Sequence, residues 1–282
     1  MNQPTWLILL FSLLAACDVS SKQPQQESTK SQNSPDSDKD PHSYSNPKEV
    51  KVRHIELELQ VSFEKKTLEG SATLTVERTT GSGDAPLVLD TQDLRIERVE
   101  SAQGRGDFQQ LPYKLGPRDT ILGSSLTIPL PAKADRVRIH YASSPAAGAL
   151  QWLTPAQTAG KKHPFLFSQS EAIYARSWIP LQDTPAVRLT YTATIRTPRD
   201  LRALMSAEND PQTPRSGEYH FEMTQPIPSY LIALAVGDLA FKPLSERTGA
   251  YAEPAMVAKA AKEFEDTEKM IAATEKLYGA YR

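Results

Sequence analysis

Apolar and polar residues begin to alternate near residue 54, and this alternation predicts β-strands. In the stretch 54–63, "HIELELQVSF", every second residue is apolar, so one face of a strand would be buried and the other wet. The same period returns in 67–77, "TLEGSATLTVE", after a turn at 64–66. Together the two segments predict a long antiparallel hairpin.

Further short apolar segments are spaced along the rest of the chain and are separated by turns that carry Gly, Pro and Asp. Many short strands without regularly interposed helices are typical of an all-β sandwich or saddle and not of a repeating βαβ fold. The fold class predicted is therefore mainly β, with one large antiparallel β-sandwich or saddle domain. The segments are 87–90, 94–100, 126–130, 136–142, 187–197 and 219–224.

Two segments lack the alternation. Residues 229–239, "SYLIALAVGDL", are apolar throughout, which fits a helix or a strand buried on both faces; the prolines just before them and Gly237 within them favour the strand. Residues 254–278 place most of their apolar side chains on one helical face, with Pro254 and Gly279 at the ends, and predict an amphipathic helix. Little of the chain is left for that helix to pack against, so it suggests the start of a truncated second domain.

The N-terminal segment predicts export and anchoring. Residues 7–16, "LILLFSLLAA", are too short an apolar run to span a bilayer and are typical of a signal peptide. The lone cysteine, Cys17, follows at once, and "LAAC" resembles the lipobox of bacterial lipoproteins, in which the signal is removed and the cysteine carries lipid. A free thiol beside an ordinary signal peptide is the alternative. We expect a lipoprotein of the bacterial cell envelope that faces the periplasm, with the choice between inner and outer membrane open.

Composition divides the remainder of the chain. The segment after Cys17 is rich in Ser, Gln, Pro, Asp and Lys and nearly devoid of apolar residues, so it cannot bury enough surface to offset the entropy of ordering. We expect a signal peptide at 1–16, a disordered tether at 17–47, the β domain at 48–242, and the beginning of a further domain at 243–282.

The chain contains no complete catalytic motif. Its formal net charge of −2 gives no electrostatic case for nucleic acid as a partner. No histidine is followed by Glu, so the H-E-x-x-H zinc helix is absent, as are G-x-S-x-G and a phosphate-binding glycine loop. We therefore assign no catalytic residue and no metal ligand to this chain. The five histidines, expected at the surface or in the core, are His42, His54, His140, His163 and His220.

One stretch, 168–185 or "SQSEAIYARSWIPLQDTP", does suggest binding chemistry. Gln169 and Glu171 are two residues apart, and in extended chain their side chains point to the same face. A carboxylate beside an amide oxygen forms an acceptor-rich pair that suits a cation. A Glu two residues from a Gln is also commonplace, so a purely structural role remains the alternative.

The same stretch resembles a known family. Residues 168–195, "SQSEAIYARSWIPLQDTPAVRLTYTATI", are similar to a signature segment in the N-terminal domain of zinc aminopeptidases of the aminopeptidase N type, in particular the leukotriene hydrolase and aminopeptidase B group. The similarity continues through "LRALMSAEND", "QPIPSYLIALAVGDL" and "EFEDTEKMIAATEKLYGAY". It implies a β saddle followed by the first helix of a truncated thermolysin-like domain.

The resemblance also implies roles for individual residues. Glu171 would bind the free α-amino group of a peptide substrate, and Gln169 would assist it. Fixing that amine at a set distance from a zinc ion makes the first peptide bond the one that is cleaved. Leukotriene-hydrolysing members of the family carry Gln where this chain has Glu171. Tyr174, Arg176 and Trp178 are expected to pack and pair within the loop, and Asp183, Thr184 and Pro185 to form a turn.

Two classes of function remain open. In the first, the chain is the N-terminal part of a membrane-anchored zinc aminopeptidase, inactive alone because the family's zinc helix and G-x-M-E-N segment are missing from it. Zinc is then the cofactor of the full-length enzyme and is not bound by this chain, and the partners are a peptide N-terminus and, through Cys17, a membrane. In the second, the chain is a non-catalytic β-saddle lipoprotein that binds peptides or proteins, since fold alone does not decide function.

Overall fold

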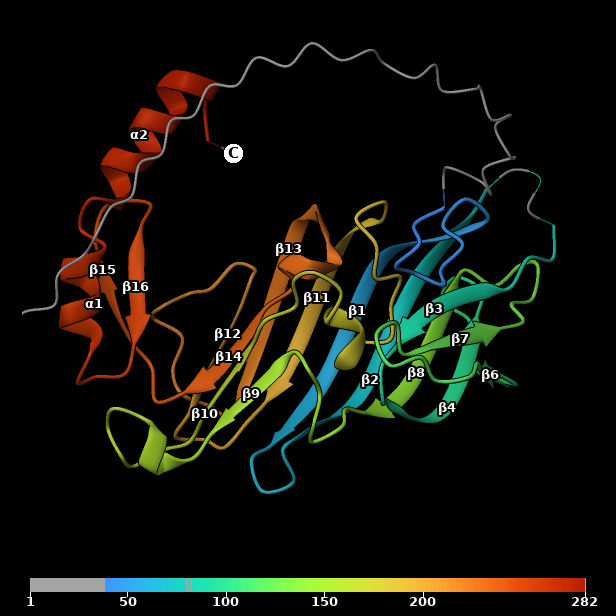
Figure 1. Ribbon diagram of the computed structural model, residues 1–282, viewed down its shortest axis with the longest axis horizontal. Coiled ribbons are helices and arrows are strands. Elements are labelled where there is room, and N and C mark those ends of the chain that lie inside the picture. Colours follow the sequence, from blue (N-terminus) through green and yellow to red (C-terminus); the bar gives the residue numbers. More distant parts are fainter. Residues whose placement is uncertain (1–38, 80, 82, 282) are drawn as a thin grey trace, which may run out of the picture. The chain divides into compact units, whose positions relative to one another are not determined.

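The computed structural model of the protein describes residues 39–79, 81 and 83–281 (Figure 1). The signal peptide predicted at 1–16, Cys17 and most of the predicted tether lie outside these residues. The described chain is mostly β-structure arranged in several sheets, so the predicted fold class is confirmed. None of the helices in the described residues is long and apolar enough to cross a membrane.

The largest sheet of the described chain has seven strands in the spatial order β13-β11-β1-β2-β8-β4-β5; Figure 1 labels all of them except β5. β1 pairs with β11 in parallel, and its other neighbour β2 is antiparallel, which confirms the predicted hairpin. The strands are β1 (Val50–Ser62), β2 (Thr67–Arg78), β4 (Arg95–Ala102), β5 (Gln109–Leu111), β8 (Arg136–Ala142), β11 (Arg188–Arg196) and β13 (Glu218–Pro228).

The alternation read from the sequence appears directly in the burial of β1. Ile55, Leu57 and Leu59 are buried in the core, whereas Glu56 and Glu58 are exposed on the opposite face. A bulge where the register shifts between residues 52 and 54 moves the phase of the alternation by one residue. The strand begins at residue 50, and the bulge explains why its first residues do not follow the alternation that starts at residue 54.

Glycine is required at one position inside the β1–β2 hairpin. Gly70 has a φ of 154°, and a Cβ built on it would lie 1.9 Å from the carbonyl oxygen of Glu58 on the neighbouring strand. Both the backbone angle and this close approach exclude a larger residue. Gly70 thus lets the two strands continue in register through a point where any side chain would separate them.

Three smaller sheets complete the architecture of the described residues. The three-stranded sheet has the order β3-β7-β6, the four-stranded sheet β12-β14-β10-β9, and β15 and β16 form a hairpin. Buried side chains from the three larger sheets join in one contiguous core. The strands are β3 (Leu87–Thr91), β6 (Lys114–Leu115), β7 (Ser124–Ile128), β9 (Leu150–Leu153), β10 (Phe165–Ser168), β12 (Arg202–Met205), β14 (Leu234–Gly237), β15 (Ala240–Pro243) and β16 (Gly249–Ala252).

The prediction of one buried strand over 229–239 is only partly right. The segment opens with a 3-10 turn, η3 (Ser229–Leu231), and only Leu234–Gly237 forms the strand β14. Leu231 is 49% exposed, so this part is not buried on both faces. A strand forms only where β10 and β12 lie on either side to accept its backbone hydrogen bonds.

The single helix predicted over 254–278 is two helices, α1 (Val257–Glu263) and α2 (Thr267–Tyr278). The chain leaves helical geometry at Phe264, where φ is −96° and ψ is 12°. α1 packs on the β15–β16 hairpin and buries Ala261. α2 buries none of its residues, and Leu277 is 73% exposed. The helix therefore forms although its apolar face is not buried.

The folded domain starts before the predicted boundary at residue 48. Ser43 and Ser45 are buried, and the Ser43 hydroxyl donates a 2.6 Å hydrogen bond to Asp90 at the end of β3. The backbone N–H of Tyr44 donates to the same carboxylate at 2.7 Å. Residues 40–47 therefore belong to the β domain and not to a disordered tether. Local composition could not indicate this, because the hydrogen-bond partner is a buried carboxylate far away in the sequence.

Arg247, in the turn of the β15–β16 hairpin, holds α2 in place. Its guanidinium donates two hydrogen bonds to the carboxylate of Glu275, at 2.8 and 2.9 Å, and a third to Glu268 at 2.9 Å. Hydrogen bonds from Arg247, and from the backbone N–H of Tyr281, lower the pKa of Glu275 to about 2. Arg247, with a further contribution from Ser245, also lowers the pKa of Glu268.

These lowered pKa values predict that α2 loosens in acid. A carboxylate whose pKa falls on folding stabilises the folded state above its unfolded pKa and loses that contribution as the pH falls towards the folded value. Hydrogen exchange in α2, corrected for the intrinsic rate, should therefore accelerate relative to β1 between about pH 5 and about pH 2. Arg247→Gln should give fast exchange at both ends of that range. Equal protection of α2 in wild type and variant at neutral pH would contradict the prediction.

Candidate functional site

Gln169 and Glu171 lie where β10 runs out into a turn. The extended chain carries both side chains to the exposed side, while Ser170 between them is only 2% exposed. Both side chains are therefore at the surface of the molecule. Their joint role as an acceptor-rich pair for a cation stays a prediction.

Ser170 fixes the backbone between the two candidate residues. Its hydroxyl donates a 3.0 Å hydrogen bond to the carbonyl oxygen of Ile232 and accepts a 3.2 Å hydrogen bond from the Trp178 indole. The N–H of Gln169 donates to the carbonyl oxygen of Ala149 at 2.8 Å. These contacts hold the main chain between the two exposed residues in place.

The amide and the carboxylate are used differently. The Gln169 side-chain oxygen accepts a 3.1 Å hydrogen bond from the backbone N–H of Glu171, which keeps one lone pair for a further donor. No described residue donates a hydrogen bond to the carboxylate of Glu171, so its acceptor positions face solvent. Glu171 is therefore the stronger candidate ligand for a cation, and Gln169 both supports it and retains an acceptor position.

The turn that follows is built on buried residues. The peptide bond from Glu171 to Ala172 is cis, and a 3-10 turn, η2 (Ala175–Ser177), leads to the fully buried Trp178. Arg176 and Trp178 pack and pair within the loop as expected. Tyr174 does not: it is 46% exposed, and its ring lies beside Gly148, where an added Cβ would meet it at 3.1 Å.

Arg176 is the centre of a buried polar network. Its Nε donates a 3.0 Å hydrogen bond to the carboxylate of Asp183 across the loop, and both side chains are fully buried. Its remaining guanidinium nitrogens donate to the carbonyl oxygens of His42 at 2.7 Å and Leu122 at 2.9 Å. Asp183, expected only in a turn, thus neutralises a buried charge and also accepts a 2.6 Å hydrogen bond from Ser229.

Asp90 is the member of this network that the sequence reading missed. It lies 3.9 Å from the Arg176 guanidinium and accepts the N–H of Asp183 at 2.9 Å, in addition to its bonds from residues 43 and 44. Burial raises the pKa of Asp90, and the positive charge of Arg176 opposes that rise. The available signal was an aspartate ending the apolar segment "LVLD", since a buried charge requires a partner.

Metal-binding residues do not converge in the part of the chain that the structure describes: no group of three or more His, Cys, Asp or Glu side chains there could hold an ion. The histidines pair locally instead, as His140 does with Glu100 at 3.0 Å. The described residues therefore do not fit a zinc site.

The chain is similar in sequence to known proteins over most of its length. The model of the peptidase M1 N-terminal domain matches residues 41–231. Leukotriene A-4 hydrolase of Xenopus laevis is 39% identical over 252 residues, which are 86% of this chain and 40% of that protein. Leucine aminopeptidase 2 of Yarrowia lipolytica is 40% identical over 253 residues, covering 86% of this chain and 37% of the relative.

A solved structure agrees with these relatives. The native yeast LTA4 hydrolase structure superposes with a TM-score of 0.78 at 36% identity, covering 89% of this chain and 39% of that one. The chain thus spans about two fifths of the length of the proteins it matches. The residues matched by the family model, 41–231, include the loop that carries Gln169 and Glu171.

Loss of the Arg176 charge should destabilise the domain strongly. Arg176→Met keeps much of the side-chain volume but leaves two buried carboxylates without their cation, which costs about 3–5 kcal/mol of unfolding free energy. The matched control is Arg196→Met, which breaks a half-exposed pair with Glu218 and should cost no more than about 1 kcal/mol. Urea unfolding of both variants measures the two losses of unfolding free energy. Equal losses would show that the buried network contributes no more to stability than the half-exposed pair of Arg196 and Glu218.

Proposed function

This chain belongs to the peptidase M1 family, and we propose that it is the N-terminal part of a membrane-anchored, zinc-dependent aminopeptidase in which Glu171 holds the α-ammonium group of the peptide substrate. The observation that carries the proposal is the outward-facing carboxylate of Glu171. It has no donor among the described residues and stands on a loop fixed from behind by Ser170 and Arg176.

The chemistry of the loop suits an ammonium group. A protonated α-amine carries three N–H donors and a positive charge, and the carboxylate of Glu171 and the free lone pair of Gln169 accept such donors as charge-assisted hydrogen bonds. An anchor of this kind selects peptides with a free N-terminus. It also sets how far the chain extends towards the reacting centre, so that cleavage stops at the first peptide bond.

The described residues of this chain offer no ligand set for zinc, so in this proposal zinc is bound by another part of the enzyme. In the full-length enzyme it would activate water and polarise the scissile carbonyl. The part of the protein described here contributes binding and orientation, and we expect it to be inactive alone. Relatives named for leucine aminopeptidase activity support peptides as substrates.

A carboxylate at position 171 favours peptide hydrolysis over epoxide hydrolysis. Among relatives of this type, the leukotriene-hydrolysing members carry a neutral amide at this position, which pairs less strongly with an ammonium ion. We therefore propose a plain aminopeptidase that requires a free amine, with little epoxide hydrolase activity.

The anchor is proposed from the N-terminal sequence. The apolar run 7–16 followed by Cys17 supports removal of a signal peptide and lipid attachment at the cysteine, with the domain facing the periplasm. A charge balance close to zero, with a formal net charge of −2, gives the domain little attraction of its own for anionic lipid. Membrane attachment would then depend on the lipid.

Replacing the carboxylate tests the amine anchor. In a full-length enzyme carrying this domain, Glu171→Gln should lower kcat/KM on free-amine substrates by roughly ten- to a hundredfold. The loss should shrink sharply for N-acetylated substrates, which cannot use the anchor. Glu64→Gln, at the tip of the β1–β2 hairpin, is the control and should leave the kinetics unchanged. Unchanged kinetics in Glu171→Gln would make the carboxylate structural and remove the basis of the proposal.

Lipid attachment is tested separately. Cys17→Ser should abolish labelling by a fatty-acid probe and leave an uncleaved or soluble form, because the serine hydroxyl cannot form the thioether. The catalytic and binding chemistry proposed above should not change. Equal recovery of the wild type and the variant in washed membranes would count against the lipobox interpretation.

A further inference from the structure

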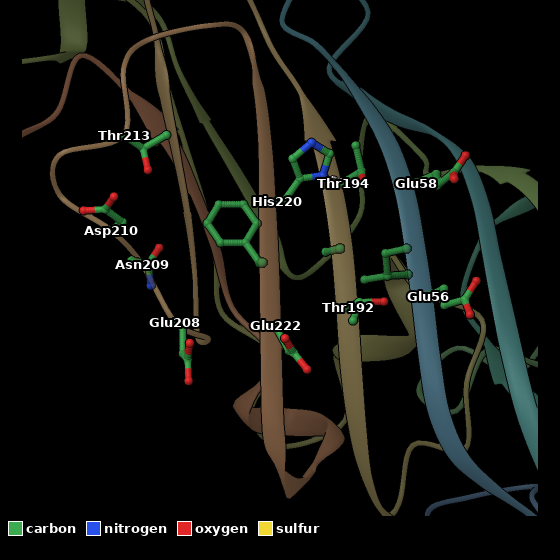
Figure 2. A pocket seen from close by; sticks show the side chains of 13 residues that line it. Glu56, Glu58, Thr192, Thr194, Glu208, Asn209, Asp210, Thr213, His220 and Glu222 are labelled. Carbon is green, nitrogen blue, oxygen red and sulfur yellow. Dashed lines mark hydrogen bonds between the residues drawn. The ribbon is translucent and has the colours of Figure 1, made fainter.

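The widest hollow shown on the sheet does not belong to the loop of Gln169 and Glu171. It is a trench of about 650 Å³ over β1, β11 and β13 (Figure 2). Most of its side chains are carboxylates, threonines and other polar groups (Figure 2), and none of residues 168–178 lines it. A substrate held by Glu171 would therefore meet the side chains of that residue's own loop and not those of the trench.

Tyr174 follows Glu171 by three positions on the same exposed turn. Its backbone N–H donates a 2.9 Å hydrogen bond to the carbonyl oxygen of Ser170, which closes the chain around residues 171–173. Glu171 and Tyr174 are both exposed, whereas Ala175, the next residue, is fully buried. A carboxylate and an aromatic ring at the surface thus come from one closed turn.

Ser177 holds the main chain of Tyr174. The carbonyl oxygen of Tyr174 accepts a 3.0 Å hydrogen bond from the N–H of Ser177 and a 2.8 Å hydrogen bond from its hydroxyl. The same hydroxyl oxygen accepts a 3.0 Å hydrogen bond from the N–H of Ala149. Because Ser177 is fully buried, these contacts tie the base of the Tyr174 side chain to the segment just before β9.

The ring of Tyr174 lies against Gly148 of that segment. A Cβ built on Gly148 would be 3.1 Å from Cδ1 of the ring and 3.2 Å from Cε1, which is tighter than an ordinary contact. The φ of Gly148 is outside the left-handed region that favours glycine, so the ring uses the missing side chain and not a special backbone angle. One edge of the ring is seated in this way, while 46% of the residue stays exposed.

The two segments that meet at this ring are apolar apart from Glu171. The turn continues after the carboxylate with Ala172 and Ile173, and residues 145–148, "PAAG", contain no polar side chain. An aromatic ring at the surface gains free energy when another apolar group covers it. The turn thus presents an acceptor for a cation together with an apolar contact.

We propose that Tyr174, seated on Gly148, is the contact for the first side chain of the peptide whose α-ammonium group Glu171 holds, and that it selects large apolar side chains. The inference rests on the proposed aminopeptidase function. The α-amine and the first side chain are bonded to the same Cα atom, so fixing the amine keeps that side chain close to the turn. Glycine has no side chain to cover the ring, and an acidic side chain would be repelled by Glu171.

Kinetics on a series of amino-acid anilides test this contact. In a full-length enzyme carrying this domain, Tyr174→Ala should lower kcat/KM for leucine and phenylalanine anilides about tenfold or more, and for glycine anilide by less than about twofold. Tyr174→Phe keeps the ring and should retain the wild-type preference. Gly148→Ala displaces the ring without removing it and should lower only the leucine and phenylalanine values, by several-fold.

A matched control is Tyr113→Ala, which removes another partly exposed ring, between β5 and β6. It should leave kcat/KM for all three anilides unchanged. Thermal unfolding checks that each variant is folded. If Tyr174→Ala does not fold, Gly148→Ala decides, and an unchanged ratio of leucine to glycine hydrolysis in the folded variant overturns the proposal.

The same series separates this inference from the function on which it rests. Glu171→Gln should lower kcat/KM for leucine, phenylalanine and glycine anilides by a similar factor, because all three carry the same free amine. If it does so while Tyr174→Ala acts equally on the three anilides or on none of them, the side-chain contact is refuted and the amine anchor stands. If Glu171→Gln changes nothing, the anchor is refuted and the contact proposed beside it falls as well.

Discussion

The fold around the candidate site depends on one buried charge. Arg176 cannot be hydrated, so its guanidinium has to find every partner within the protein. It does so in Asp183 of the same loop, in Asp90 at the end of β3 and in backbone carbonyl groups of residues 42 and 122. These contacts hold four segments that are far apart in the chain in one arrangement. The loop that carries Glu171 is one of the four.

The parts of the fold that follow from local pattern could be predicted. Alternation fixed β1, β2, β8 and β11 because a one-residue slip would turn every apolar side chain of those strands to water. The break at Phe264 between the helices and the short extent of β14 could not be read in the same way. The extent of β14 depends on where β10 and β12 lie beside it, and periodicity carries no information about neighbours. The break at Phe264 is a local turn, in which residue 267 donates back to the Phe264 carbonyl oxygen, and the apolar period runs through it without interruption.

The same distinction between local pattern and distant contact applies to the candidate site. The exposure of Gln169 and Glu171 could be expected from their polar side chains and the turn that follows. The contact between Asp183 and Asp90 could not be expected, because the two residues are separated by 93 positions and the sequence around either gives no sign of the other. Ser43 was assigned to the tether for the same reason, since its partner is a carboxylate in β3.

The parallel pairing of β1 with β11 has a consequence for how the chain is made. β1 ends at Ser62 and β11 begins at Arg188, so one side of β1 has no native partner until the intervening chain has been synthesised. The β1–β2 hairpin is local and forms early, whereas closure of the sheet centre waits for a contact of high sequence separation. Until that contact forms, β1 keeps an open hydrogen-bonding edge, which can pair with another chain before the native partner arrives.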